Sequence, residues 1–281
     1  MYLIMLITII GVAIAVWHIR SVSASGGTGG VVAGNVTVHF IDVGQGDATL
    51  IQTGEGNVLI DGGDRRTASA LVQYLKDSGV NRLDRVVATH PHADHIAGLA
   101  NVIDTFEVDT IIMPKVAHTT LTFERLLDAI EKNGVTLQEP VAGDSFTLGD
   151  TVFTIVAPNS TGYRNLNNYS VSLRVLHGSV AFLFTGDAEA ESENEMLEKR
   201  RNISAQVFHV GHHGSKTSNT QAFLDAVSPE IAVISCGTGN TFGHPSEEIL
   251  ERLEEAGVTV YRTDLLGTIV MSSDGSSLTV H

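Results

Sequence analysis

The sequence predicts an α/β protein in which two packed sheets carry helices on their outer faces. Two observations support this fold class. Apolar, β-branched runs that are typical of strands open both halves of the chain, and amphipathic runs with helical spacing lie between them. The 281 residues are 43% hydrophobic and 17% charged, which fits one large domain.

The N-terminus differs in composition from the rest of the chain. Residues 1–20 are almost entirely apolar and predict either a signal peptide or a membrane anchor, although no positively charged segment precedes them. Residues 21–34 are rich in Gly and Ser and predict a flexible tether. We therefore expect an exported protein, either membrane-anchored or extracellular, whose folded domain spans residues 35–281.

The first half of this domain begins with strands and continues with alternating helices and strands. An alternating β-branched run predicts the first strand, and Gly-rich turns separate it from the next two. Apolar side chains at helical spacing predict the helices. The predicted elements are strands 36–42, 48–53 and 57–60, helix 67–78, strands 85–89 and 110–113, and helix 123–132.

The second half follows the same alternation. Its predicted strands are 180–184, 206–209, 230–235 and 258–261, and its predicted helices are 189–201, 220–227 and 246–255. Ser246 is expected to cap the last helix. The stretch 267–280 predicts a hairpin that turns at Asp274-Gly275.

A cluster of metal-ligand residue types follows the strand at 85–89. His90, His92, Asp94 and His95 fall within six residues. Because His90 and His92 are two positions apart, an extended chain directs both imidazoles to the same side. Imidazole and carboxylate ligands without a thiolate suit zinc, manganese or iron, and suit a catalytic site better than a closed structural one. An accidental histidine cluster in an exposed loop is the less favoured alternative.

Further candidates also follow predicted strands. Asp187 comes after the strand at 180–184 and would, on its own, be interpreted as the N-cap of the next helix. His212 and His213 lie in a Gly-flanked loop after the strand at 206–209. By contrast, His209 lies within that strand and is expected to pack in the core.

Three other residues have less certain roles. Asp61 ends the strand at 57–60 and could orient a ligand histidine. His244 precedes the last helix and could equally be a loop histidine without a ligand. Asp47 could contact substrate or bond to the backbone of its own Gly-rich turn.

The run His90-x-His92-x-Asp94-His95 resembles the signature of the metallo-β-lactamase fold superfamily, over about residues 36–275. More narrowly, the FIDVGQGDA run at 40–48 resembles the C-terminal hydrolase domain of ComEC-type competence proteins, as do FTGD, HHGS and FGHP further on. Those proteins are polytopic membrane channels for DNA uptake. The resemblance implies a four-layer αββα sandwich with the motifs along one edge.

The resemblance also implies two divalent metal ions, with zinc preferred and manganese as the alternative. His90 and His92 would hold the first ion. Asp94, His95 and His213 would hold the second, and Asp187 would bridge both. A hydroxide shared by the two ions would attack the substrate.

The same resemblance suggests catalytic roles for His212 and His244, which would face substrate, and for Asp61 behind the ligands. One departure concerns the first ion. Many superfamily members place another histidine on it between the early cluster and the bridging Asp. Here only His118 and His177 lie in that interval, together with the run Asn-Asn-Tyr-Ser at 167–170.

Charge and cysteine content limit the possible functions. The net charge of −15 provides no overall attraction to DNA, RNA or anionic lipid. The basic residues that could line an access route are Arg65, Arg66, Arg164 and Lys216. A single Cys excludes an internal disulfide framework. A phosphodiesterase or nuclease of the ComEC-like type is the preferred hypothesis, with DNA as substrate. The alternatives are a hydrolase of a small phosphodiester, lactone or β-lactam, and a non-catalytic exported binding protein.

Overall fold

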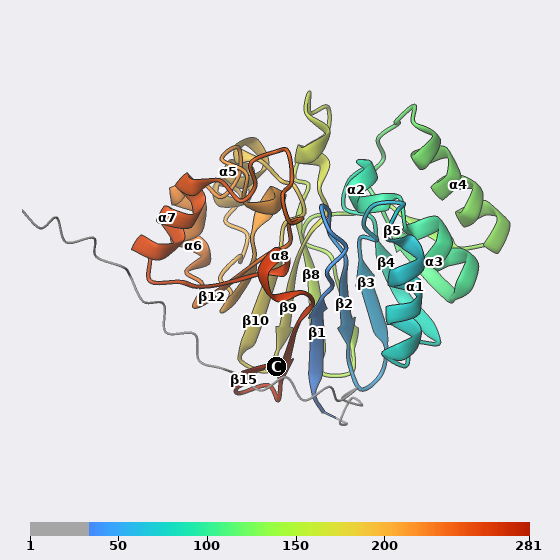
Figure 1. Ribbon diagram of the computed structural model, residues 1–281, viewed down its shortest axis with the longest axis horizontal. Coiled ribbons are helices and arrows are strands. Elements are labelled where there is room, and N and C mark those ends of the chain that lie inside the picture. Colours follow the sequence, from blue (N-terminus) through green and yellow to red (C-terminus); the bar gives the residue numbers. More distant parts are fainter. Residues whose placement is uncertain (1–33) are drawn as a thin grey trace, which may run out of the picture.

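The computed structural model describes residues 34–281, which form two mixed sheets with helices on both outer faces (Figure 1). The predicted α/β sandwich is therefore confirmed. The predicted leader at 1–20 and nearly all of the predicted tether lie outside the described residues. Among residues 34–281, no helix combines the length and the apolar character needed to cross a membrane.

The first sheet has eight strands in the order β15-β14-β1-β2-β3-β4-β5-β6. Its strands are β1 (Val36–Phe40), β2 (Thr49–Gln52), β3 (Asn57–Ile60), β4 (Arg82–Val87), β5 (Glu107–Ile112), β6 (Thr136–Gln138), β14 (Ile269–Ser273) and β15 (Leu278–Val280). The helices on its outer side are α1 (Ala68–Asp77), α3 (Leu99–Thr105) and α4 (Leu121–Asn133), and the short α2 (Ala93–Ile96) lies at one edge (Figure 1).

The second sheet has seven strands in the order β13-β12-β11-β10-β9-β8-β7. Its strands are β7 (Ser145–Leu148), β8 (Thr151–Ala157), β9 (Ser172–His177), β10 (Val180–Phe184), β11 (Val207–His209), β12 (Ile231–Ile234) and β13 (Thr259–Arg262). The helices of this half are α5 (Ala190–Glu198), α6 (Gln221–Val227), α7 (Glu247–Glu255) and the short α8 (Thr263–Leu266), with one-turn helices η1 (Leu166–Tyr169) and η2 (Gly211–Gly214).

Three apolar layers separate these four layers of structure. Residues of α1, α3 and α4 pack on one face of the first sheet, for example Leu75 and Leu126 with Leu59. The two sheets face each other through side chains such as Phe40 and Phe184. The third layer joins the second sheet to α5, α6 and α7. Since alternate side chains of a strand point to opposite faces, each buried strand contributes to two layers.

The largest difference from the sequence prediction lies between residues 133 and 179. No strand was predicted there, whereas β6, β7, β8 and β9 form in this segment. The strands β6 and β7 are short edge strands without a buried position, so they carry little periodic signal. In β8 buried and half-buried positions alternate over the first four residues, and a fully buried run follows. The closing hairpin is confirmed, since β14 pairs antiparallel with β15 around Asp274.

Candidate metal centre

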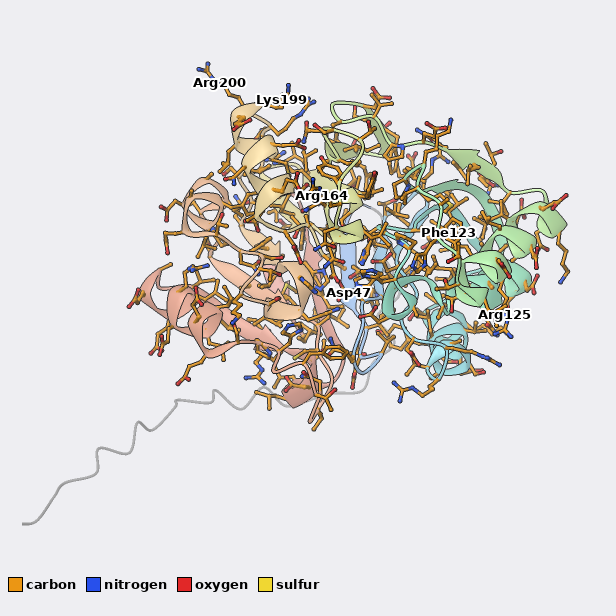
Figure 2. All side chains as sticks on the ribbon, turned by 90° about the horizontal axis from the view of Figure 1, so that it is seen from above. Asp47, Phe123, Arg125, Arg164, Lys199 and Arg200 are labelled. Carbon is orange, nitrogen blue, oxygen red and sulfur yellow. The ribbon has the colours of Figure 1, made fainter. Side chains whose placement is uncertain are left out.

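The predicted ligand residues all follow strands that end at one edge of the sandwich. The strands β3, β4 and β5 run parallel, and so do β10, β11, β12 and β13. The HxHxDH motif follows β4 and runs into α2, Asp187 follows β10, and the two adjacent histidines follow β11. This edge is the upper one in Figure 1, and Figure 2 looks onto it.

Asp94, His95 and His213 form what we call the second cluster. Each contributes a ligand atom within 4.8 Å of the others. His213 Nε2 lies 3.3 Å from Asp94 Oδ2, and His95 Nε2 lies 4.0 Å from the same oxygen. Both imidazoles are buried. The residues predicted to hold the second ion are thus brought together.

Each imidazole of the second cluster is held from behind by buried acceptors. His95 Nδ1 donates to Asp61 Oδ2 at 2.7 Å. His213 Nδ1 donates to the Ser235 carbonyl oxygen at 3.0 Å and lies 3.4 Å from Asp47 Oδ1. Since Nδ1 is the donor in both rings, the neutral form of each ring presents the lone pair of Nε2 to the cluster, as a metal ligand must.

His90, His92 and Asp187 form the first cluster. His90 Nε2 lies 3.0 Å from His92 Nδ1 and 3.5 Å from Asp187 Oδ2. Thr89 Oγ1 donates to the Asp61 carboxylate at 2.7 Å and can therefore accept from His90 Nδ1 at 3.1 Å. This chain of bonds leaves the lone pair of His90 Nε2 facing the cluster.

Asp187 connects the two clusters through its two carboxylate oxygens. Its Oδ1 lies 3.2 Å from His95 Nε2 and 3.8 Å from His213 Nε2. Its Oδ2 faces His90, and its backbone N–H donates to Ser170 Oγ at 3.1 Å. A ligand that bridges two ions would need this position.

The Gly-flanked loop turns sharply at the two adjacent histidines. His212 and His213 adopt left-handed backbone conformations, with φ of 53° and 55°, and Gly214 follows at 80°. Non-glycine residues adopt such conformations mainly where the surrounding structure enforces them, often at functional sites. The two rings diverge, and their centroids are 6.1 Å apart.

His212 and His244 lie beside the clusters. His212 Nε2 is 3.6 Å from Asp187 Oδ2, and its Nδ1 is 3.1 Å from Thr217 Oγ1. The His244 ring centroid lies 5.4 Å from that of His212 and 6.2 Å from that of His213. Both histidines predicted to face substrate therefore lie directly beside candidate ligand residues.

The carboxylates make this edge attract positive charge. Burial by itself would lower the pKa of His95 and His213, but nearby carboxylates, Asp187 foremost, outweigh it and raise both pKa values well above the ordinary value. Burial would raise the pKa of Asp187, yet His95, His213 and His90 hold it well below its usual range. Burial and the neighbouring His95 lower the pKa of His90.

Divalent metal ions fit this arrangement. Within residues 34–281, the buried atoms His95 Nε2, His213 Nε2, Asp187 Oδ1 and Asp47 Oδ1 have no hydrogen-bond partner. A buried polar atom without a partner is costly, and a cation bound among several converging ones would satisfy them. The ligand set of imidazole and carboxylate suits zinc, manganese and iron alike.

The structure also shows what lies in the interval where a further histidine was sought. His177 ends β9, lies 3.2 Å from Ser273 Oγ, and is not part of either cluster. The His118 ring centroid lies 6.3 Å from that of His92. His118 Nδ1 lies 3.1 Å from Thr120 Oγ1 in its own loop. Ser170 Oγ lies 3.4 Å from His90 Nδ1.

Asp47 is one of the residues whose role the sequence left open. It is buried, and its backbone N–H donates to the Asp94 carbonyl oxygen at 3.2 Å. Its carboxylate lies behind His213 and 3.7 Å from His209, which is packed in the core as predicted. The sequence offered only a Gly-rich turn as a signal, and no local pattern indicates a partner far along the chain.

An αββα sandwich with paired clusters of buried histidine and aspartate at one edge defines a class of metal-binding α/β proteins. Residues 41–238, more than half of the chain, match the metallo-beta-lactamase superfamily. The chain therefore belongs to this superfamily.

Curated relatives narrow the comparison. The chain is 32% identical over 250 residues to ComE operon protein 3 of Bacillus subtilis, covering 83% of this chain and 32% of that protein. It is 31% identical over 238 residues to Competence protein ComA of Neisseria gonorrhoeae, covering 81% of this chain and 31% of that protein. The chain thus spans about a third of the length of these relatives, and the predicted resemblance to ComEC-type competence proteins is confirmed.

Solved structures support the fold. The metallo-beta-lactamase fold protein YhfI from Bacillus subtilis matches with a TM-score of 0.57 at 14% identity, covering 85% of this chain and 99% of YhfI. CmlA, a diiron beta-hydroxylase from Streptomyces venezuelae, matches with the same TM-score and identity, covering 85% of this chain and 54% of CmlA. At this identity the similarity concerns the fold alone.

Proposed function

We propose that this chain is a metal-dependent phosphodiesterase that acts on nucleic acid. The observation that carries the proposal is the position of Asp187 between two ligand clusters, with one carboxylate oxygen toward each. Two divalent ions, when bound, supply an activated water and stabilise negative charge on a phosphoryl oxygen. The relative from Neisseria gonorrhoeae is named a competence protein, which favours nucleic acid as the substrate.

The chain's own residues would orient the ligands and handle protons. Asp61 and the Ser235 carbonyl keep a proton on Nδ1 of His95 and His213, which leaves both Nε2 atoms free to coordinate. Thr217 Oγ1 donates to Glu189 Oε1 at 3.0 Å and so accepts from His212 Nδ1. With its Nδ1 proton engaged in this way, His212 would take up at Nε2 the proton released by the attacking water and pass it to the leaving oxygen.

His244 would contribute on the substrate side of the clusters. Its Nδ1 is buried and has no hydrogen-bond partner within residues 34–281. Its ring stacks on Phe242, whose side chain is 67% exposed. His244 could therefore donate a hydrogen bond to a phosphoryl oxygen as negative charge develops there.

A small phosphodiester is the second candidate substrate. The net charge of −15 favours it, because an enzyme that tracks long DNA usually presents a basic surface. The two candidates differ only in substrate, so a single set of assays separates them.

The test measures metal content and hydrolysis on the full chain. Single-stranded DNA, double-stranded DNA and a small chromogenic phosphodiester are assayed before chelation, after chelation, and after zinc or manganese is restored. We expect chelation and Asp187→Asn to abolish hydrolysis, a loss of more than about 10³-fold, while Asp128→Asn on the exposed face of α4 retains it. Cleavage of the small phosphodiester without cleavage of DNA would favour the second candidate. Absence of bound metal after supplementation would refute both.

We also propose that residues 1–20 direct export and either anchor the chain or are removed. The proposal rests on their apolar composition. Cell fractionation with N-terminal sequencing tests it, and recovery of the intact chain in the cytoplasm would contradict it.

A further inference from the structure

Four basic side chains line one pocket on the outer face of the second sheet. Arg174 comes from β9, and Lys199, Arg200 and Arg201 follow α5. The pocket has a volume of about 200 Å³. In a chain with 17 basic and 32 acidic residues, this concentration of positive charge is unexpected.

None of these four cations takes part in an ion pair within residues 34–281. The ion pairs of lysine and arginine found there use other cations, namely Arg66, Arg82, Lys115, Lys132, Arg252 and Arg262. The pocket thus holds positive charge that the surrounding carboxylates do not neutralise.

Two of the guanidinium groups are fixed through one nitrogen. Arg174 Nε donates to the Ser204 carbonyl oxygen, and Arg201 Nε donates to Asn159 Oδ1, both at 2.8 Å. No other hydrogen bond of either side chain is found in the described part of the chain, so the Nη groups stay available. Burial lowers the pKa of Arg174, because no carboxylate compensates for its loss of solvent. An oxyanion with several acceptor oxygens would satisfy such donors.

The backbone around the pocket is adapted to these side chains. Arg200 has a φ of 52° just after α5, at a position where glycine is the usual residue. Opposite it, a Cβ added at Gly143 would lie 3.0 Å from Arg201 Nη1. Attraction between basic residues and a helix C-terminus accounts for Lys199. It does not account for the left-handed Arg200 or for Arg174 on a neighbouring strand.

The strand β9 and the position of Arg164 lie between the metal centre and the pocket. In the view of Figure 2, Arg164 lies between Asp47, near the metal centre, and the pair Lys199 and Arg200. Arg125 lies on the opposite half of the molecule in the same view. Ser172 at the start of β9 donates to the Thr185 carbonyl oxygen at 3.4 Å, beside the site, and Arg174 follows two residues later.

We propose that the pocket formed by Arg174, Lys199, Arg200 and Arg201 binds backbone phosphates of a nucleic-acid strand that extends from the metal centre. The inference rests on the proposed function, since it assumes a polyanionic substrate. Phosphate contacts of this kind fix the register of a strand without reading its sequence. They would also explain how so acidic a chain holds nucleic acid.

The test uses two variants whose charge loss is matched. The pocket variant carries Lys199→Gln and Arg200→Gly, and the control carries Lys76→Gln and Arg125→Gln on exposed positions of α1 and α4. Binding of the full chain to a labelled single strand of about 20 nucleotides is measured by fluorescence anisotropy in chelator at several salt concentrations. Competition with inorganic phosphate and binding to phosphatidylglycerol vesicles are measured alongside.

We expect the pocket variant to bind the strand about 20-fold more weakly than the control. The slope of log affinity against log salt should fall by about 2. Arg200→Gly alone should weaken binding about fivefold without lowering Tm, because glycine suits the left-handed backbone. Equal binding by pocket variant and control would overturn the proposal. So would a matching fall in Tm, or an effect on vesicles without an effect on the strand.

The chelator keeps this test separate from the phosphodiesterase proposal. If DNA is hydrolysed but the pocket variant binds like the control, only the pocket proposal fails. If binding depends on the pocket but no phosphodiester is hydrolysed with metal restored, only the phosphodiesterase proposal fails.

Discussion

Asp187 directs one carboxylate oxygen toward each ligand cluster, but the two clusters differ in the groups that contact the Nδ1 atoms of their histidines. In the second cluster, His95 is held by the carboxylate of Asp61, and His213 lies between Asp47 and a backbone carbonyl. In the first cluster, the Nδ1 atom of His90 lies against the hydroxyls of Thr89 and Ser170. His92 is half-buried, whereas His90, His95 and His213 are buried.

This difference predicts that the two clusters have unequal affinities for a metal ion. A carboxylate behind a ligand histidine raises its basicity and fixes its orientation, which a hydroxyl does less strongly. Burial prevents water from competing for the ligand atoms. We therefore expect the second cluster to bind its metal ion more tightly than the first, and the following variants test that ranking.

The largest effect is expected for the adjacent histidines. In His213→Ala, the affinity of the second cluster for its metal ion should fall by more than about 100-fold, and activity should be lost with the ion. His212→Ala should retain both ions while turnover falls by about 10²–10⁴-fold. Metal content after dialysis and steady-state kinetics check this. Equal metal retention in both variants would remove His213 from the ligand set and make His244 the better candidate.

A smaller effect is expected from the carboxylate behind His95. Asp61→Asn keeps the side-chain shape but accepts the Nδ1 proton less strongly, so affinity at the second cluster should fall by about 10–100-fold. Calorimetric titration of the metal-free chain should show the tighter step weakened and the weaker step retained. An equal loss of affinity in both steps would mean that Asp61 also orients His90 of the first cluster, through Thr89.

A still smaller effect is expected at the first cluster. Ser170→Ala removes one hydroxyl near His90 and a bond from the Asp187 backbone N–H. Affinity for the weaker ion should fall by about two- to tenfold, the range for one neutral hydrogen bond. The same titration measures it, with Ser276→Ala in the closing turn as the control. A larger loss at the tighter step would reverse the ranking of the clusters.

No effect on metal affinity is expected for a buried histidine outside the site. Burial lowers the pKa of His39 to about 4, whereas carboxylates raise that of His95. Between about pH 4 and about pH 6.5, His39 is therefore protonated mainly in the unfolded chain, so this residue costs stability as the pH falls through that range. Urea unfolding of the metal-free chain at about pH 7 and about pH 4.5 should show His39→Gln reducing the pH-dependent loss by about 2 kcal/mol. An unchanged pH dependence would contradict the buried, neutral state of His39.

The sequence by itself determined the layered fold and most of the candidate site. Strand alternation, helical spacing and the HxHxDH run are local patterns, so they can be recognised without knowing how the chain folds back on itself. The same local patterns indicated Asp187 and the histidine pair, because each follows a recognisable strand. They failed for the short edge strands β6 and β7, where few buried positions produce a period.

Only the tertiary structure decided what surrounds the ligands. Asp47 and His213 are 166 positions apart in the numbering, and nothing near either residue signals that they meet. The hydroxyl of Ser170 beside His90, the left-handed backbone of His212 and the basic pocket made by Arg174 and Arg201 have the same origin. These contacts depend on strand order and register between distant segments, and local spacing carries no information about either.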